Sequence, residues 1–262
     1  MAACAKGEGM HLSPFRIDSS ALTHQGRVRD DNQDSYCIRP DDGLWAVADG
    51  MGGHEGGEWA AARLAEELGK VALPADLAQA GERVAAAVRA ANAAILAEAA
   101  GRGRQMGSTI VALIVRDQSY LVLWVGDSRA YLLRDGEFTR LSRDHTQVQE
   151  MVDRGLIKPE DAARHPMAHI LSRAVGVGDA LALDRVEGEV RSGDVFLLCS
   201  DGLHSYVDEA EIKRLLGRGS PERALDALVA RTLEAGAPDN VTGIAVCAGE
   251  PTLLSLGQPV KR

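Results

Sequence analysis

Four aspartates stand beside strand-like apolar runs, three at the end of a run and one just before the start of a run. They are Asp49, Asp127, Asp201 and Asp239. One aspartate at a strand end is usually only part of a turn. Four gathered at one rim of a sheet would repel one another unless hard cations neutralised them. Because the ligands would all be oxygens, the pattern favours Mg²⁺ or Mn²⁺.

The stretch after the first aspartate is rich in glycine and reads DGMGGHEGGE. Glycine-rich turns after strands often bind phosphate. A dinucleotide loop that began with Gly50 and Gly52 would need a third glycine where Glu55 stands, and no Gly-Lys-Ser/Thr follows. The spacing therefore argues against a nucleotide loop and favours a turn that presents Asp49 to a metal.

A second charged stretch, GRVRDDNQD, covers residues 26–34. Its simplest interpretation is a solvated charged turn. The functional interpretation is that one arginine binds a phosphate through its guanidinium group, while Gln33 and Asp34 face the metals.

The elements that must position these residues are runs of strands with helices in pairs. Helical spacing predicts helices over 55–71 and about 77–100, and Ser220-Pro221 favours a further helix start. Strand patterns cover 17–24, 35–39, 44–49, 107–116, 119–126, 128–141, 170–175, 184–190, 194–200 and 240–248. This order predicts antiparallel sheets covered by helices, and not an alternating parallel fold.

Three local signals add detail to this outline. Asp135-Gly136 lies between two strand-like runs and predicts a hairpin. Asp208 and Glu211 have the spacing of a capping box for the helix over 209–217. The stretch from 143 to about 168 is polar with short helical pieces, which predicts an inserted, mobile subdomain.

The composition sets the class of protein. The 262 residues suit one large domain or two small ones, and 38 acidic against 29 basic residues give a net charge of −9. This balance argues against nucleic acid or an anionic membrane as the main partner. Cys4, Cys37, Cys199 and Cys247 form no Cys-x-x-Cys pair, and we expect buried free thiols. With no apolar signal core and no run of about 18 apolar residues, a soluble cytoplasmic protein is expected.

Taken in order, the motifs resemble one known family. The segments R-x-x-N-Q-D, DGMGGH, G-S-T, GDSRAYLLRDG, LLCSDGL and PDNVT are similar to those of the bacterial type 2C, metal-dependent Ser/Thr protein phosphatases, and the match covers about 17–248. The resemblance implies an α+β fold with four layers, in which two antiparallel β-sheets are flanked by pairs of antiparallel helices. It also implies one catalytic domain over 15–250, with a flap at about 143–168 and tails at 1–14 and 251–262.

The resemblance assigns metal ligands at one end of this sandwich. It implies that Asp49 bridges two tightly bound ions and that the carbonyl of Gly50 binds the second. Asp201 and Asp239 would hold the first ion. Asp127 resembles the family's ligand for a third, weaker ion. The implied cofactors are therefore Mn²⁺ or Mg²⁺.

The resemblance also assigns the catalytic residues and shows two departures. Arg29 matches the phosphate-binding arginine, five residues before Asp34, which would hold a metal-bound water. Gln33 stands where many members have glutamate, and its amide brings no charge to the second metal. Met51 stands where eukaryotic relatives carry a histidine proposed as general acid. A thioether donates no proton, so metal-bound water or another group such as His54 must protonate the leaving group.

The remaining histidines have weaker signals. His165 and His169 are four residues apart, but Pro166 lies between them, so we interpret them as surface residues of the inserted segment. His145, in the segment RDHT, is predicted to cap a helix in a structural role.

The predicted function is hydrolysis of phosphoserine and phosphothreonine in proteins, by direct attack of a water that bridges two metals. No nucleophile–base pair stands out, which agrees with a route without a phosphoenzyme. The expected partners are phosphoproteins and a cognate Ser/Thr kinase, and we expect a monomer that binds neither nucleic acid nor membrane. The alternatives are the same chemistry on a small phosphorylated molecule and a metal-binding interaction module without catalysis. A nucleotide-binding regulator is the least favoured.

Overall fold

The computed structural model describes residues 15–53, 55–162 and 164–250. The predicted tails at 1–14 and 251–262 lie outside the described residues, as do Cys4 and His54.

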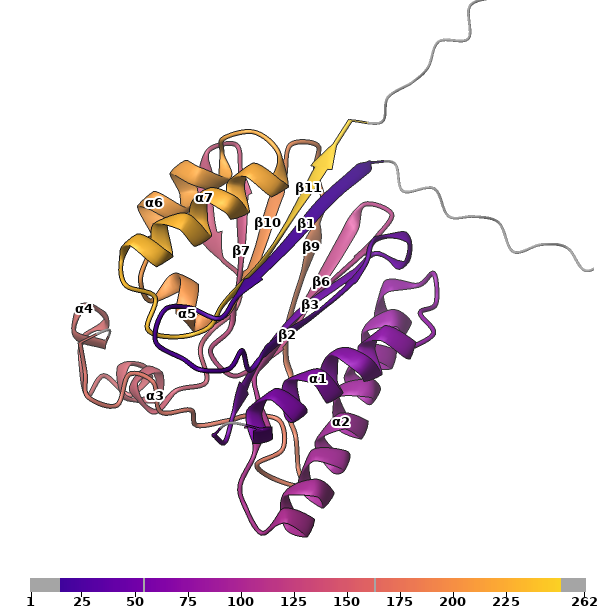
Figure 1. Cartoon of the computed structure of the whole chain (residues 1–262). Coiled ribbons are helices and arrows are strands. Elements are labelled where there is room, and N and C mark those ends of the chain that lie inside the picture. The colour runs from indigo at the N-terminus through magenta and orange to yellow at the C-terminus, as the bar shows by residue number, and fades with distance from the viewer. Residues whose placement is uncertain (1–14, 54, 163, 251–262) are drawn as a thin grey trace, which may run out of the picture.

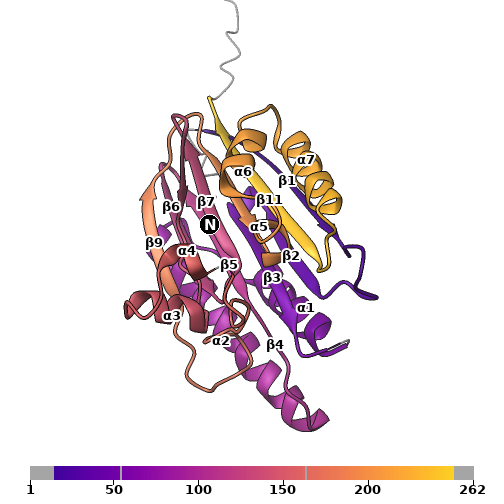
Figure 2. The ribbon, with the colours of Figure 1, turned by 90° about the vertical axis from the view of Figure 1, so that its left-hand side faces the viewer.

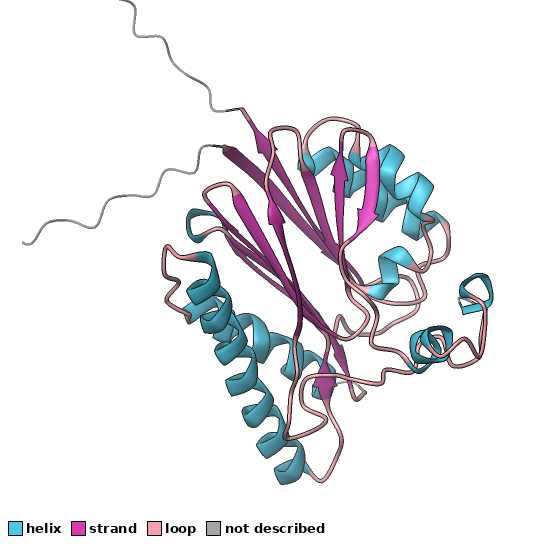
Figure 3. Cartoon of the chain, turned by 180° about the vertical axis from the view of Figure 1, so that it is seen from behind, coloured by secondary structure: helices cyan, strands magenta, loops and turns pink. Residues whose placement is uncertain are grey.

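Two antiparallel sheets form the centre of the molecule (Figures 1 and 3). The first sheet has five strands in the order β1 (Arg16–His24), β11 (Val241–Gly249), β10 (Val195–Cys199), β7 (Arg129–Arg134) and β8 (Glu137–Arg140). The second has the order β2 (Asp34–Arg39), β3 (Leu44–Met51), β5 (Ile110–Arg116), β6 (Ser119–Val125) and β9 (Asp184–Glu189), and β4 (Gly107–Ser108) pairs with β3.

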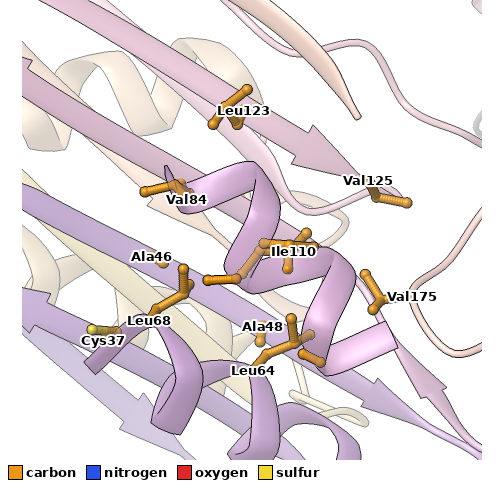
Figure 4. Close-up of a cluster of buried hydrophobic side chains, with 14 of the residues drawn as sticks. Cys37, Ala46, Ala48, Leu64, Leu68, Val84, Ile110, Leu123, Val125 and Val175 are labelled. Atoms are coloured by element: carbon orange, nitrogen blue, oxygen red, sulfur yellow. The ribbon is translucent and has the colours of Figure 1, made fainter. Parts of the chain in front are cut away.

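Helices cover the outer face of each sheet, as Figure 1 shows. The second sheet carries α1 (Glu55–Lys70) and α2 (Leu77–Arg102), and the first carries α6 (Glu209–Leu216) and α7 (Pro221–Glu234). Buried side chains form three clusters, one between the two sheets and one under each helix pair. Figure 4 shows part of the cluster under α1 and α2, where Leu64 and Leu68 lie near Ile110. The predicted four-layer α+β sandwich is confirmed.

The burial pattern explains the sequence of the central strands. All but the last residue of β5, IVALIVR, are buried, because helices cover one face of the sheet and the other sheet covers the second face. The edge strand β9 alternates half-buried and exposed residues instead. The predicted hairpin is also confirmed, since Asp135 and Gly136 join β7 to β8 with positive φ angles of 50° and 78°.

Helix α2 is long and apolar enough to cross a membrane by length and composition, with a mean hydropathy of 1.3 over an 18-residue window. One face of this helix, however, packs on the second sheet through Val84, Val88 and Ile95, which are buried. Glu82 and Arg89 are exposed on its other side. This is the pattern of a core helix that covers a sheet.

The segment between β8 and β9 lies beside the layered part of the molecule (Figures 1 and 2). It contains α3 (Gln147–Asp153) and α4 (Pro159–Ala162). Thr146 caps α3 by accepting a hydrogen bond from the Gln149 N–H, so the predicted helix cap at His145 is wrong. The strand predicted at 170–175 is also wrong, because residues there form only isolated bridges to other segments.

Three further details of the outline differ from expectation. A short helix, α5 (Asp201–His204), follows β10 and was not predicted. Asp208 accepts from the N–H of Glu211, but the Glu211 carboxylate pairs with Arg214 and Arg231, so only half of the capping box forms. Cys37 and Cys199 are buried free thiols, whereas Cys247 is only half-buried. Ser220 caps α7, as the sequence indicated.

Candidate metal centre

One end of the sandwich contains a cavity of about 970 Å³. The predicted site residues Arg29, Asp49, Gly50, Asp127, Asp201 and Asp239 all line it. They come from the loop after β1, the end of β3, the turn after β6, the start of α5 and the residue pair before β11. Asp34 lies directly beside this group, because it is the cross-strand partner of Asp49 in the β2–β3 pairing. The topology therefore gathers all seven predicted residues at one place.

Hydrogen bonds from a neighbouring segment fix the backbone of Asp49. Its N–H donates to Thr109 Oγ1 at 3.1 Å, and its carbonyl accepts from the Thr109 N–H at 2.8 Å and from Ser108 Oγ at 2.9 Å. The Thr109 hydroxyl also bonds to Ser128 Oγ at 2.7 Å, which ties this strand end to the turn that carries Asp127. The sequence motif G-S-T thus positions Asp49, a role that the sequence alone did not reveal.

The glycines after Asp49 allow two backbones to approach closely. A Cβ atom on Gly50 would lie 2.1 Å from the carbonyl oxygen of Gly57, in the first turn of α1. The Gly50 N–H donates to the carbonyl of Gln33 at 3.1 Å. The glycines after Asp49 therefore allow α1 to begin directly against the end of β3. The chain turns there, at the rim of the cavity.

Burial and neighbouring charges shift the pKa values of the clustered carboxyl groups, upward for three of them and downward for Asp201. Burial, followed by the neighbouring charges of Asp34 and Asp201, raises the pKa of Asp49 well above its usual range. Burial raises the pKa of Asp34 to about 7 and that of Asp127 to about 8, and the charge of Asp201 adds to both. Burial also acts on Asp201, but hydrogen bonds from His169 and Asp49 hold the pKa of that carboxyl below its usual value.

The oxygen atoms at this end fit a divalent cation. Asp34 Oδ2 accepts from Ser200 Oγ at 2.9 Å, but the buried Oδ1 atom has no hydrogen-bond partner among the described residues. A buried carboxylate oxygen without a partner is costly, and a water bound to a nearby cation would satisfy it. The Asp49 and Asp201 carboxyl groups lie close enough to perturb each other's pKa values, and a bound cation would offset their charges.

The carboxylates are not arranged as a ready-made ligand set. In the described part of the chain, no three acidic, histidine or cysteine side chains converge as they would around an ion. Asp239 faces Arg29 instead, with Nε to Oδ1 at 2.9 Å and Nη2 to Oδ2 at 2.7 Å. Asp201 lies 3.5 Å from Nδ1 of His169. Metal binding would therefore require these side chains to turn towards the ion.

His169 has a place that the sequence did not indicate. Its side chain is exposed, as expected for a surface residue, but it lines the cavity and contacts Asp201. Hydrogen bonding and charge from Asp201 raise its pKa. His165 does not line the cavity, and its Nδ1 accepts from the Met167 N–H at 3.2 Å. Pro166 prevents a regular helical pair, so spacing alone could not distinguish the two histidines.

Two other residues support the site and were not singled out in the sequence. Asn240 Oδ1 accepts from the Gln33 N–H at 2.9 Å, and its Nδ2 donates to the carbonyls of Gln25 and Asp31 at 2.8 and 2.9 Å. It thereby holds the loop that carries the predicted phosphate-binding arginine. His204 Nε2 donates to the backbone carbonyl of Asp127 at 3.0 Å. Burial, followed by a nearby arginine, lowers the pKa of His204 to about 4, so its ring is neutral near pH 7.

The two departures from the family pattern also lie in the cavity wall, because Gln33 and Met51 both line it. His54 lies outside the described residues. His145 does not line the cavity, but its Nδ1 accepts from the Gly126 N–H at 3.1 Å, next to Asp127. This contact agrees with its predicted structural role.

Comparisons with known proteins agree with this geometry. A family model described as protein phosphatase 2C matches residues 21–235. The serine/threonine protein phosphatase PstP of Mycobacterium tuberculosis is 37% identical over 225 residues, which cover 85% of this chain and 43% of that relative. The serine/threonine phosphatase stp of Listeria innocua is 34% identical over 235 residues, covering 86% of this chain and 93% of the relative.

A solved structure has the same fold. The catalytic domain of PstP in complex with two manganese ions matches with a TM-score of 0.80 and 35% identity, and the match covers 89% of this chain and 98% of that one. The chain thus spans less than half of the full-length M. tuberculosis relative and nearly all of its catalytic domain. Since the family model covers most of its residues, the chain belongs to the protein phosphatase 2C family.

Proposed function

We propose that this protein is a metal-dependent phosphatase that hydrolyses phosphoserine and phosphothreonine in proteins, with Mn²⁺ or Mg²⁺ as cofactor. The observation that supports this most is the convergence of Asp49, Asp127, Asp201 and Asp239 with Arg29 in one cavity. The names of the relatives point to the same activity, and the PstP catalytic domain has been solved with two manganese ions.

The proposed ligands are those expected from the sequence. Asp49 and the carbonyl of Gly50, with Asp201 and Asp239, would hold two ions, and Asp127 would hold a weaker third. When bound, the ions would lower the pKa of water to supply a nucleophile and would neutralise the charge of the phosphate. Burial, followed by repulsion from neighbouring carboxylates, raises the pKa values of Asp49 and Asp127, and a bound cation would offset both effects by stabilising the ionised forms.

Arg29 and Asp34 have roles that do not depend on holding a metal directly. The Arg29 guanidinium already forms a fork of two hydrogen bonds to a carboxylate, and the same fork matches a phosphate. In the proposed enzyme, Arg29 leaves Asp239 and binds the substrate phosphate. Asp34 Oδ1 has an open lone pair beside Asp49 and would accept a hydrogen bond from the attacking water.

Met51 lines the cavity but donates no proton, so it takes no part in protonating the leaving group. A role for His54 there stays a prediction, because that residue lies outside the described part of the chain. A cognate Ser/Thr kinase, a monomeric state, a cytoplasmic location and a flap at 143–168 also remain predictions from the sequence.

The proposal is tested by comparing substrates under one set of conditions. With Mn²⁺ present, we expect phosphate release from phosphothreonine and phosphoserine peptides, with higher kcat/KM than for small phosphomonoesters. Asp49→Asn, which keeps the shape but removes the charge, should abolish turnover of all substrates. Faster turnover of a small phosphorylated metabolite than of any peptide would favour the small-molecule alternative. No turnover of any phosphomonoester would favour the interaction module.

A further inference from the structure

The cavity has a second arginine that the proposed reaction does not use. Arg173 lines it, and the side chain is 38% exposed. Its Nη1 donates to Asp184 Oδ1 at 2.7 Å and to the carbonyl of Ala182 at 3.4 Å. Its Nε and Nη2 groups have no hydrogen-bond partner within the ranges that the structure describes. One edge of the guanidinium is therefore anchored, while the other remains available.

A chain of contacts holds this anchor in place. Asp184 Oδ2 lies 3.2 Å from His145 Nε2, and the other ring nitrogen of His145 accepts from the Gly126 N–H. The indole ring of Trp124 stacks on the imidazole of His145, with centroids 6.3 Å apart. Arg173 is thus fixed relative to the turn that carries Asp127. A side chain that is held in this way loses less conformational entropy when it binds a ligand.

The charges around Arg173 make it distinctive. The carboxyl groups that line the cavity are Asp30, Asp31, Asp49, Asp127, Asp201 and Asp239. Among the described residues two arginines line it, and Arg29 already makes a bidentate pair with Asp239. The chain has a net charge of −9, so an acidic substrate meets repulsion over much of the surface. Arg173 offers such a substrate a local cation with open N–H groups.

The position of Arg173 separates it from the reacting phosphate. Its anchor, Asp184, begins the edge strand β9, and Asp49 ends β3, three strands away in the same sheet. Strands lie about 4.8 Å apart, so the two strands are roughly 14 Å apart. Each residue of an extended peptide spans about 3.3 Å. Because the Arg173 side chain extends from its anchor back into the cavity, it can contact a substrate residue about two to four positions from the phosphorylated one.

We propose that Arg173 is a specificity-determining residue that binds an anionic group of the phosphoprotein about two to four residues from the phosphorylated serine or threonine. The group is a carboxylate or a second phosphate, both of which match the open edge of a guanidinium. This inference rests on the proposed phosphatase function.

A series of peptides tests the inference in the wild-type protein first. Each peptide has one phosphothreonine in an otherwise neutral sequence, with a single glutamate or phosphoserine placed from four residues before it to four residues after it. We expect kcat/KM to rise about three- to tenfold for anions about two to four positions away on one side, as one charge-assisted contact predicts. Comparing glutamate with phosphoserine at the preferred position shows which anion is favoured.

Variants assign the preference to the arginine. In Arg173→Ala the ratio of kcat/KM for acidic over neutral peptides should fall to about one, and Arg173→Glu should prefer a lysine at the same position. Arg173→Lys should keep part of the ratio, because it keeps the charge but loses the planar fork. Arg185→Ala is the matched control and should leave the ratio unchanged, since Arg185 is also on the β9 side but pairs with Glu82 away from the cavity.

The outcomes separate this inference from the function on which it rests. If wild-type protein hydrolyses neither p-nitrophenyl phosphate nor any peptide, the proposed function fails. If it hydrolyses both but shows no acidic preference, or if Arg173→Ala and Arg173→Glu keep the preference, the inference about Arg173 is wrong. The peptide series in the wild-type protein shows whether an acidic preference exists even if a variant fails to fold.

Discussion

Arg29 and Asp239 form a bidentate ion pair, with N–O distances of 2.9 and 2.7 Å, although the proposed function assigns one to phosphate and the other to metal. Both side chains are partly exposed, so the pair stabilises the fold little. Hydrogen bonding and charge from Asp239 raise the pKa of Arg29. Binding of a metal would therefore favour binding of the substrate, because a cation that binds Asp239 releases the Arg29 guanidinium for a phosphate.

This relationship predicts the effect of removing the arginine. Arg29→Ala should raise KM for a phosphopeptide by about tenfold and lower kcat less, because a charge-assisted bidentate contact contributes roughly 1.5 kcal/mol or more. Mn²⁺ should bind as tightly or more tightly, since Asp239 loses its competing partner. Arg27→Ala is the control in the same loop. An unchanged KM in Arg29→Ala, with the effect in Arg27→Ala instead, would overturn the assignment.

The aspartates should differ in what their removal does. Asp49→Ala should lose metal and nearly all activity, because a bridging carboxylate would be missing from two ions. Asp127→Ala should keep near-normal tightly bound metal but turn over far more slowly, since only the weaker third site is lost. Metal analysis of the gel-filtered variants, together with kcat on a phosphopeptide, checks both. Wild-type kcat in Asp127→Ala at saturating Mn²⁺ would mean that its segment is only a turn.

The raised pKa values predict an unusual dependence of stability on pH. Asp34 and Asp127 have pKa values of about 7 and about 8 in the folded protein, against about 3.9 for an ordinary aspartate. Between about pH 4 and about pH 8 the folded state therefore binds more protons than the unfolded state. Over this range the contribution of these two groups to the free energy of unfolding falls as pH rises. Chelator-treated protein should melt at lower temperature at about pH 8 than at about pH 5.5.

Two controls make this test specific. Saturating Mn²⁺ should remove most of the fall, because a cation replaces the protons that the carboxyl groups would otherwise hold. Asp127→Asn should flatten the dependence without metal, since an amide does not titrate. Stability that rises steadily over this range in chelator would show that the buried carboxyl groups do not dominate.

The loop that carries Arg29 should depend on a single side chain behind it. Asn240 is buried and bonds to three backbone groups of that loop, those of Gln25, Asp31 and Gln33. Asn240→Ala should lower the free energy of unfolding by about 1–3 kcal/mol, because three part-buried hydrogen bonds to the loop are lost. It should also raise KM. Denaturant titrations of Asn240→Ala and of the wild-type protein measure this difference, and an unchanged free energy of unfolding would show that Asn240 does not hold the loop.

Much of the fold could be predicted because its signals are local. Asp135 and Gly136 tolerate the positive φ angles of a hairpin turn, so the two residues alone predict it. The apolar run of β5 by itself predicts a strand that is covered on both faces. The stretch 170–175 looked like a strand for the same reason. It forms only isolated bridges, such as Val175 with Ser108, because which segments meet there depends on the whole topology.

The candidate site shows the same limit. Asp49, Asp201 and Asp239 stood out as acids beside apolar runs, and the fold brings them to one cavity. His169 and Arg173 did not stand out, because their importance comes from contacts with Asp201 and Asp184, which lie 32 and 11 residues further along the chain. No spacing rule in the sequence reports such contacts.

Phosphate release from a phosphothreonine peptide, followed in one protein sample through chelation and metal return, tests whether the cavity holds a catalytic metal centre. The proposed metal centre predicts that activity vanishes when chelator removes the metal and returns when Mn²⁺ or Mg²⁺ is added back. Arg29→Ala should follow the same cycle at a higher KM. Full activity in protein shown by elemental analysis to be free of divalent metal would show that the reaction needs no metal.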